Sequence, residues 1–154
     1  MRLERTGCVI YLVGAGSFME ELWCKNRQDL GKRGEDLALE YLLQKGMVLL
    51  ARNWRSGHKE LDLVMYDGEF IRFVEVRAKN YPVAVEPYQT ITLPKQRLIM
   101  AAARSFLAAV RTGKIKGIDG LTGGREAVFD IVSIIFNGEL FNIKYIREAF
   151  GPQW

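Results

Sequence analysis

Two stretches of the chain have the apolar spacing of amphipathic helices. In residues 31–44 the apolar positions recur every three to four residues, and Gly46 supplies a stop signal after them. Residues 92–110 repeat this spacing, with Thr92 as the expected N-cap and Pro94 in the first turn. The residues of the predicted buried stripe on this second helix are Leu98, Ala102, Phe106 and either Ala109 or Val110.

Five further segments have the alternation or the composition of β-strands. They are residues 47–54, 60–66, 70–77, 128–135 and 140–146. Asp-Gly at 67–68 and Asn-Gly at 137–138 separate consecutive strands, and such dipeptides favour tight hairpins. Residues 78–91, with two prolines, and 112–125, with five glycines, are predicted to be loops. The order of helix, three strands, helix and two strands predicts an α/β fold.

The composition fits one globular domain. A chain of 154 residues can bury most of its apolar surface around one core, and 49% hydrophobic with 26% charged residues is ordinary for such a domain. The net charge of +4 and the pI of about 9.1 permit a nucleic-acid partner without requiring one. Cys8 and Cys24 have no Cys/His cluster beside them, which excludes a structural zinc site and suits a cytoplasmic location.

The beginning of the chain differs from the rest. Arg2 and Arg5 precede an apolar run at residues 8–18 that loosely imitates a signal peptide. This run contains two glycines and is too short to span a bilayer, which needs about 20 apolar residues. We therefore favour an atypical, partly disordered extension over residues 1–28, or a start codon placed too far upstream, rather than a secretion signal. Residues 29–154 are expected to form the folded domain, with no membrane association.

Charged residues gather on one predicted face of the first hairpin. Because side chains alternate along a strand, Glu60 and Asp62 share a face of one strand, and Glu75 and Arg77 share a face of the next. The apolar residues predicted to pack into the core on the other face are Leu61, Leu63, Val74 and Val76. Facing Cβ atoms of paired strands lie about 5 Å apart, and two carboxylates at that distance repel unless a cation lies between them.

Two interpretations of this charged face remain. A divalent cation such as Mg²⁺ can bind one or two carboxylates, waters and a substrate phosphate oxygen, and can lower the pKa of a bound water. Arg77 could then stabilise charge on the phosphoryl oxygens. Alternatively, these are solvated charges with a cross-strand ion pair between Glu60 and Arg77, which contributes little to stability. On spacing alone the ion pair is the simpler interpretation.

The order of several motifs along the chain changes that balance. These motifs occupy residues 30–38, 41–42, 46, 51–55, 60–64, 73–77, 95–97, 129–132 and 149–150. Together they resemble the YraN-like family of predicted endonucleases, over nearly the whole chain from Leu30 to Phe150. The Asp on one strand and the Glu-Val-Arg at 75–77 on the next also resemble the PD-(D/E)XK nuclease core, with similarity to Holliday-junction resolvases. The resemblance implies a restriction-endonuclease-like core, with a mixed β-sheet flanked by helices.

The resemblance also implies roles for individual residues. Asp62 and Glu75 are then the ligands of Mg²⁺ or Mn²⁺, and Arg77 occupies the position of the nuclease lysine. Glu35 on the first helix completes the metal site through water, unless it is an ordinary exposed carboxylate. Glu60 is an orienting residue beside the metal, although the residue before it departs from the family pattern.

Arg77 is the departure that bears most on catalysis. An arginine keeps its proton and is a poor general base, whereas a buried lysine can lose its proton. Three alternatives follow: the metal-bound water needs no base, or Lys79 or Lys95 contributes, or activity is weak or absent. The phosphate backbone of a nucleic acid is expected to meet the polar side of the second helix and the end of the preceding strand. The residues predicted to contact it are Lys79, Lys95, Gln96, Arg97 and Arg104.

The function implied is metal-dependent hydrolysis of phosphodiester bonds in DNA, in particular branched or damaged DNA. The alternative is a non-catalytic nucleic-acid-binding protein that keeps the nuclease fold. A third interpretation is an interaction protein whose basic helix meets an acidic partner. Similarity to resolvases suggests a homodimer, because cutting two strands needs two active sites. Asp130, in an apolar strand, is predicted to be a buried orienting carboxylate rather than a ligand.

Overall fold

Seven strands form one mixed sheet. The computed structural model of the chain describes residues 2–5, 8–11 and 27–151. In this part of the chain the strand order is β1-β2-β7-β6-β5-β4-β3, and only β5 and β6 run parallel. The strands are β1 (Arg2–Arg5), β2 (Cys8–Tyr11), β3 (Val48–Ser56), β4 (Lys59–Tyr66), β5 (Ile71–Asn80), β6 (Ala127–Asn137) and β7 (Leu140–Phe150). The helices are α1 (Arg27–Gln44), the 3-10 helix η2 (Pro87–Thr90), α2 (Leu93–Arg111) and α3 (Asp119–Thr122).

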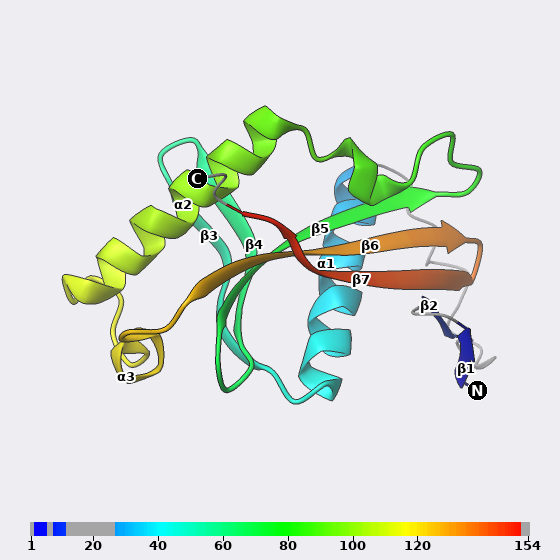
Figure 1. Ribbon diagram of the computed structural model, residues 1–154. Helices are drawn as coiled ribbons and strands as arrows, with labels where there is room; N and C mark the ends of the chain where they lie inside the picture. Colours follow the sequence, from blue (N-terminus) through cyan, green and yellow to red (C-terminus); the bar gives the residue numbers. More distant parts are fainter. Residues whose placement is uncertain (1, 6–7, 12–26, 152–154) are drawn as a thin grey trace.

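The two long helices cover opposite faces of this sheet (Figure 1). α1 packs on β3, β4 and β5 over an apolar cluster that includes Ala38 and Leu42. α2 packs on β3 and β4 from the other side, over a second cluster that includes Ile99 and Phe106. Because both faces are covered, a charged residue on a central strand is removed from water and needs a partner.

The predicted order of elements is confirmed. α1, β3, β4, β5, α2, β6 and β7 follow one another as expected, and both predicted hairpins are antiparallel pairs, β4 with β5 and β6 with β7. The mixed α/β sheet between helices is also the expected architecture. β1 and β2 lie within the predicted extension and continue the sheet beyond β7, whereas residues 12–26 of that extension lie outside the described residues. η2 and α3 are short helices inside the two predicted loops.

Two details of the predicted burial are wrong. Leu98 is 52% exposed, and Ile99 takes its place in the buried stripe of α2. Ile99 and Leu98 lie three and four residues before Ala102, so both spacings fit the period of a helix, and the other predicted members, Ala102, Phe106 and Val110, are buried. Leu61 and Leu63 are predicted to share a face, yet Leu61 belongs to the cluster under α2 and Leu63 to the cluster under α1. The alternation breaks at Asp62, the residue at which β4 leaves the ladder with β5.

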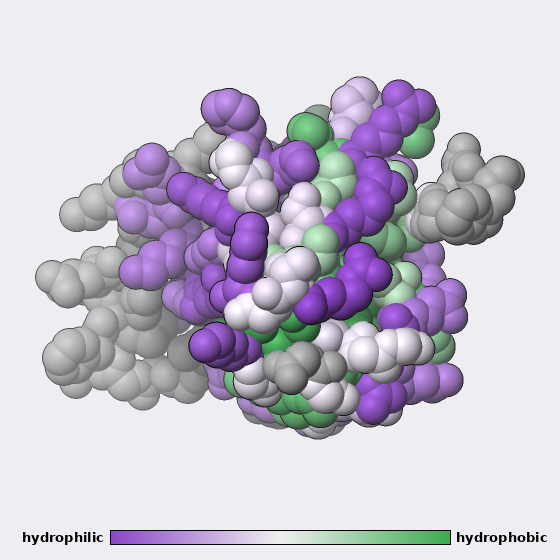
Figure 2. Space-filling model, turned by 90° about the vertical axis from the view of Figure 1, so that its left-hand side faces the viewer, coloured by the Kyte–Doolittle hydropathy of each residue, from purple (hydrophilic) through white to green (hydrophobic). Residues whose placement is uncertain are grey.

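The surface is largely hydrophilic on the side shown in Figure 2, where a narrower apolar area lies between charged side chains. Large exposed apolar residues occur on several elements of the described chain: Leu43, Val48, Leu49, Tyr81, Val85, Leu93, Leu98 and Leu140. Scattered apolar side chains of this kind are normal on a protein surface. Among the described helices, none combines the length and the apolar character needed to cross a membrane.

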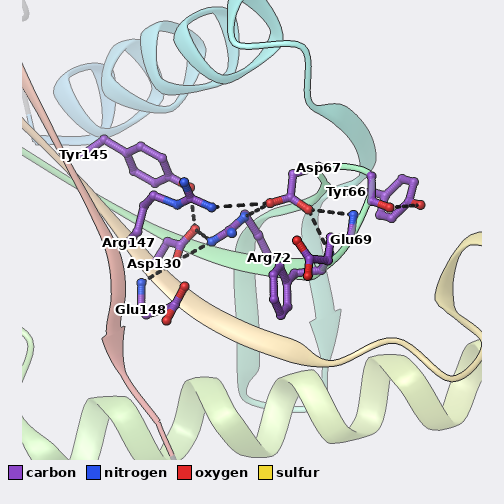
Figure 3. A network of polar contacts seen from close by, with 10 residues as sticks. Tyr66, Asp67, Glu69, Arg72, Asp130, Tyr145, Arg147 and Glu148 are labelled. Atoms are coloured by element: carbon purple, nitrogen blue, oxygen red, sulfur yellow. Dashed lines mark hydrogen bonds and ion pairs between the residues drawn. The ribbon is translucent and has the colours of Figure 1, made fainter.

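A buried polar network joins the turn before β5 to β6 and β7 (Figure 3). Arg72 is fully buried; its Nε donates to Asp67 Oδ2 at 2.5 Å, and its Nη1 donates to Asp130 Oδ2 at 3.0 Å. Asp130 also accepts hydrogen bonds from the Tyr145 hydroxyl at 2.5 Å and from the Glu148 backbone N–H at 2.7 Å. Asp130 is therefore the buried orienting carboxylate that the sequence predicts. A buried charge requires such partners, so the network fixes the start of β5 against its neighbours.

α1 lies very close to β5 at Gly34. A Cβ atom added to this glycine would lie 2.7 Å from the Cβ of Ala78, a distance shorter than any ordinary contact. Gly31, one turn earlier in the same helix, has no atom within 4 Å of such a Cβ. The absence of a side chain at Gly34 therefore brings the helix down onto the strand and sets the height of Glu35 above the sheet.

Gly34→Ala is expected to lower the free energy of unfolding by about 1–3 kcal/mol, because the added methyl group forces α1 away from Ala78. Gly31→Ala is the matched control. It is expected to raise stability by up to about 1 kcal/mol, since alanine favours a helix over glycine. Urea denaturation of both variants measures the difference. Equal stability of the two variants would show that the close contact does not constrain the helix.

Candidate active site

β4 and β5 separate at Asp62, and this point is called the fork below. The antiparallel ladder ends at the pair Leu63 and Val74, and its register would next set Asp62 opposite Glu75. Instead, the Asp62 carboxylate accepts a hydrogen bond from the Val76 backbone N–H at 2.8 Å. A side chain thus replaces the backbone carbonyl as acceptor, and the Asp62 carboxyl group lies close enough to Glu75 for their charges to interact.

Glu75 is the buried carboxylate of the fork. Its residue is 2% exposed, and its Oε1 is bound by two cations. Arg77 approaches from the same strand, with Nη2 at 2.9 Å, and Lys95 approaches from the first turn of α2, with Nζ at 3.1 Å. Both contacts offset part of the cost of burying a carboxylate at a site with so little solvent.

Asp62 carries the unbalanced charge of the pair. Burial, together with the negative charge of Glu75, raises its pKa from 3.8 to about 7, although the residue keeps some contact with solvent. The Val76 N–H and the Lys95 ammonium act in the opposite direction, but they do not compensate. Asp62 is therefore partly protonated near neutral pH. A cation bound at the fork would favour the deprotonated carboxylate and release that proton.

Glu35 lies at the margin of this group. Its charge contributes to the raised pKa of Asp62, so α1 does bring it near the fork. Its Oε2, however, is bound by Arg52 Nη2 at 3.4 Å, and the same guanidinium binds Asp36 Oδ1 at 2.6 Å. Arg52 thereby ties the edge strand β3 to α1 and holds Glu35 in place. A contribution of Glu35 to a metal site would have to pass through water.

Glu60 does not join the group. Its Oε1 accepts hydrogen bonds from Arg55 Nε at 3.0 Å and Nη2 at 2.9 Å, across the pairing of β3 with β4. The alternative ion pair between Glu60 and Arg77 does not form, because Arg77 binds Glu75 instead. A role for Glu60 in orienting the site stays a prediction.

The predicted nucleic-acid contacts fall into two groups. Lys95 lies in the fork, and Lys79 follows Arg77 by two residues on β5, where it is half-buried. Gln96 is turned toward its own helix, since its Nε2 donates to the Ile91 carbonyl at 3.2 Å. The exposed members of the predicted set are Arg97 and Arg104 on α2. The structure therefore leaves these two arginines most accessible and moves Lys95 into the site itself.

The donor set fits a loosely held hard cation. Among residues 2–5, 8–11 and 27–151, no group of three or more His, Cys, Asp or Glu side chains is placed to hold a metal ion. Asp62 and Glu75 nevertheless supply two carboxylates, which is what Mg²⁺ takes from proteins when waters and substrate phosphate complete its shell. The raised pKa of Asp62 shows the repulsion that such a cation would relieve. The fork suits Mg²⁺ or Mn²⁺ bound together with substrate.

Two features of the site do not follow from the sequence pattern. The contact of Lys95 with Glu75 depends on where α2 lands on the sheet, and the Val76 N–H becomes an anchor for Asp62 only because the strands fork. Lys95 itself is among the residues predicted to assist catalysis or to contact phosphate; its ion pair with Glu75 is what the sequence does not show.

Comparison with known proteins matches the same part of the chain. A family model described as "Uncharacterised protein family UPF0102" matches residues 34–134. A UPF0102 protein of Bacteroides thetaiotaomicron is 34% identical over 124 residues, which cover 80% of this chain and 93% of the relative. One from Chlorobium chlorochromatii is 43% identical over 130 residues, covering 79% and 91%. The matched residues include both carboxylates of the fork and Lys95.

Asp62→Asn is expected to change the pH dependence of stability. The folded pKa of about 7 lies above the unfolded 3.8, so between these values the folded state keeps a proton that the unfolded state releases. Stability of the unchanged protein due to this group therefore falls as pH rises from about 4 to about 7. Asparagine keeps an acceptor for the Val76 N–H but has no such titration. In chelator, the Tm of Asp62→Asn should rise relative to the Tm of the unchanged protein as pH increases over this window. A Tm difference that does not change with pH would contradict the assignment.

Proposed function

The chain belongs to the UPF0102 family, the YraN-like proteins of the PD-(D/E)XK nuclease superfamily, and on that premise we propose that it is a metal-dependent endonuclease that hydrolyses phosphodiester bonds of DNA. The family name assigns no activity. The observation that carries the proposal is the fork, where Asp62 and Glu75 lie close together and burial together with like charge raises the pKa of Asp62.

Each residue of the fork has a separate role in the proposed hydrolysis. Asp62 and Glu75 would hold the cation, which when bound supplies polarisation of the phosphate and a more acidic water. Arg77 keeps its proton throughout and can donate hydrogen bonds to the non-bridging phosphate oxygens as negative charge develops on them. Lys95 holds Glu75 from the opposite side and carries a second positive charge toward the same oxygens.

A second candidate function is nucleic-acid binding without turnover. The observation that favours it is that both Arg77 and Lys95 already bind Glu75, so this carboxylate is neutralised without a metal ion. In that case the basic residues around the fork bind the phosphate backbone, and the carboxylates serve only to hold them in position. This alternative predicts salt-sensitive binding that does not depend on divalent cations.

Cleavage of labelled linear duplex, single-stranded and four-way-junction DNA in Mg²⁺ or Mn²⁺ tests the proposal. The unchanged protein is expected to cut at least one of these substrates. Asp62→Asn and Glu75→Gln should each lower the rate by about 100-fold or more, since the metal supplies several kcal/mol of transition-state stabilisation. Asp36→Asn is the matched control, because Asp36 is an exposed carboxylate bound to Arg52 outside the fork.

The outcomes separate the two candidates. Binding of DNA without cleavage of any substrate would favour the non-catalytic alternative. Cleavage that survives both Asp62→Asn and Glu75→Gln would come from a contaminant or from another site, and would remove the fork as the catalytic centre.

Substitution of Arg77 tests its proposed role as a phosphate contact. Arg77→Gln is expected to lower the cleavage rate by about 100-fold, as removal of one preorganised donor to a developing negative charge does in other enzymes. Arg77→Lys should retain much more activity than Arg77→Gln, because it keeps the positive charge at the same place. Rates measured at saturating DNA provide the comparison. Equal rates for the two variants would show that the charge at this position does not act on the reacting phosphate.

A further inference from the structure

The register of the sheet places another basic residue in line with Arg77. Arg77 lies beside Ser133 of β6, and Ser133 lies beside Lys144 of β7. Since neighbouring strands are about 4.8 Å apart, the backbones at Arg77 and Lys144 are separated by about 10 Å. Lys79 faces the same side as Arg77, because it follows two residues later on β5. Three cations therefore share one face of β5, β6 and β7.

This face is covered differently from the rest of its side of the sheet. α2 packs on β3 and β4, and in Figure 1 the strands β5, β6 and β7 extend past it to the right. η2 packs instead on β5 and β6. From η2, Tyr88 brings its ring to the Lys144 ammonium, with Nζ 4.4 Å from the ring centroid. An aromatic ring holds an ammonium group by its electron-rich face and does not neutralise its charge.

The charges of Lys79 and Lys144 on this face are not offset. Neither Lys79 nor Lys144 has a carboxylate within ion-pair distance in the described part of the chain, in contrast to Arg77 and Lys95. The excess positive charge begins directly beside Glu75 and extends across two strands to Lys144. Two uncompensated lysines near a carboxylate pair are complementary to a polyanion that continues beyond the phosphate at the fork.

We propose that Lys144, positioned by Tyr88 and assisted by Lys79, binds a second phosphate of the nucleic acid, an inference that rests on the proposed function. The bound strand then runs from the fork to β7 around η2, because Ser133, between Arg77 and Lys144, is 2% exposed and η2 packs on β5 and β6. It does not follow α2 alone, where the sequence pattern places all the predicted contacts except Lys79. Lys144 escapes sequence analysis because its relation to Arg77 exists only through the register of two strand pairs.

Binding of fluorescently labelled single-stranded and four-way-junction DNA, measured by anisotropy in chelator, tests this inference apart from cleavage. Lys144→Gln is expected to raise Kd about three- to tenfold and to reduce the slope of log K against log salt by about 1. Lys144→Arg should keep both the affinity and the slope, since it preserves the charge. Tyr88→Leu should raise Kd with little change of slope, because the charge remains but its position is no longer held.

Lys45→Gln is the matched control. Lys45 follows α1 and makes the same kind of contact, with Nζ 4.8 Å from the centroid of the Tyr41 ring, but Tyr41 belongs to the cluster on the other face of the sheet. Its substitution should change Kd by less than about twofold and leave the salt slope unaltered.

The outcomes separate this inference from the proposed function. Equal affinities of Lys144→Gln and Lys45→Gln would overturn the inference and leave the proposed function standing. Loss of binding in Lys144→Gln without cleavage by the unchanged protein would support the surface and overturn the nuclease. Absence of DNA binding by the unchanged protein would overturn both.

Discussion

The hydrogen bond from the Val76 N–H to the Asp62 carboxylate is the interaction on which the arrangement of the site depends. A backbone N–H inside a sheet requires an acceptor, and the ladder between β4 and β5 has already ended at Leu63 and Val74. Because a side chain of β4 supplies the acceptor, β4 can diverge while β5 continues beside β6. The same bond draws the Asp62 carboxyl group to the opening and brings it near Glu75. One hydrogen bond therefore determines both the position of the Asp62 carboxyl group and its interaction with the charge of Glu75.

The negative charges of the two carboxylates are compensated to different degrees. Glu75 has two cations on its Oε1, Arg77 from its own strand and Lys95 from α2. Asp62 has only the weak influence of Lys95 and a backbone N–H against burial and two neighbouring negative charges. Under the proposed function, a divalent cation would be attracted mainly by Asp62 and repelled by the cations at Glu75. Under the proposed function the metal is held firmly only when a phosphate adds its own negative charge, which couples metal binding to substrate binding.

Periodicity predicted the elements and placed Glu75 and Arg77 together, because both depend on alternation within one strand. It failed at Leu61 and Leu63, where the fork breaks alternation, and at Leu98, where the neighbouring Ile99 is buried instead. The family motifs indicated Asp62 and Glu75 but could not show what surrounds them. The contacts of Lys95, Arg52 and Lys144 depend on where the helices pack on the sheet and on the register of distant strands. Local sequence does not encode either.

The fork also requires that β5 be fixed from every direction, because Glu75 lies in the middle of this strand. Near its end, the missing side chain of Gly34 brings α1 onto Ala78. At its start, Arg72 is bound to Asp67 and Asp130, and the latter is bound in turn by β7. These constraints lie on the α1 side, whereas the cations that meet Glu75 lie on the α2 side. A site whose carboxylate is placed by a strand anchored in this way can keep its geometry while β4 diverges beside it, which is what a preorganised centre needs.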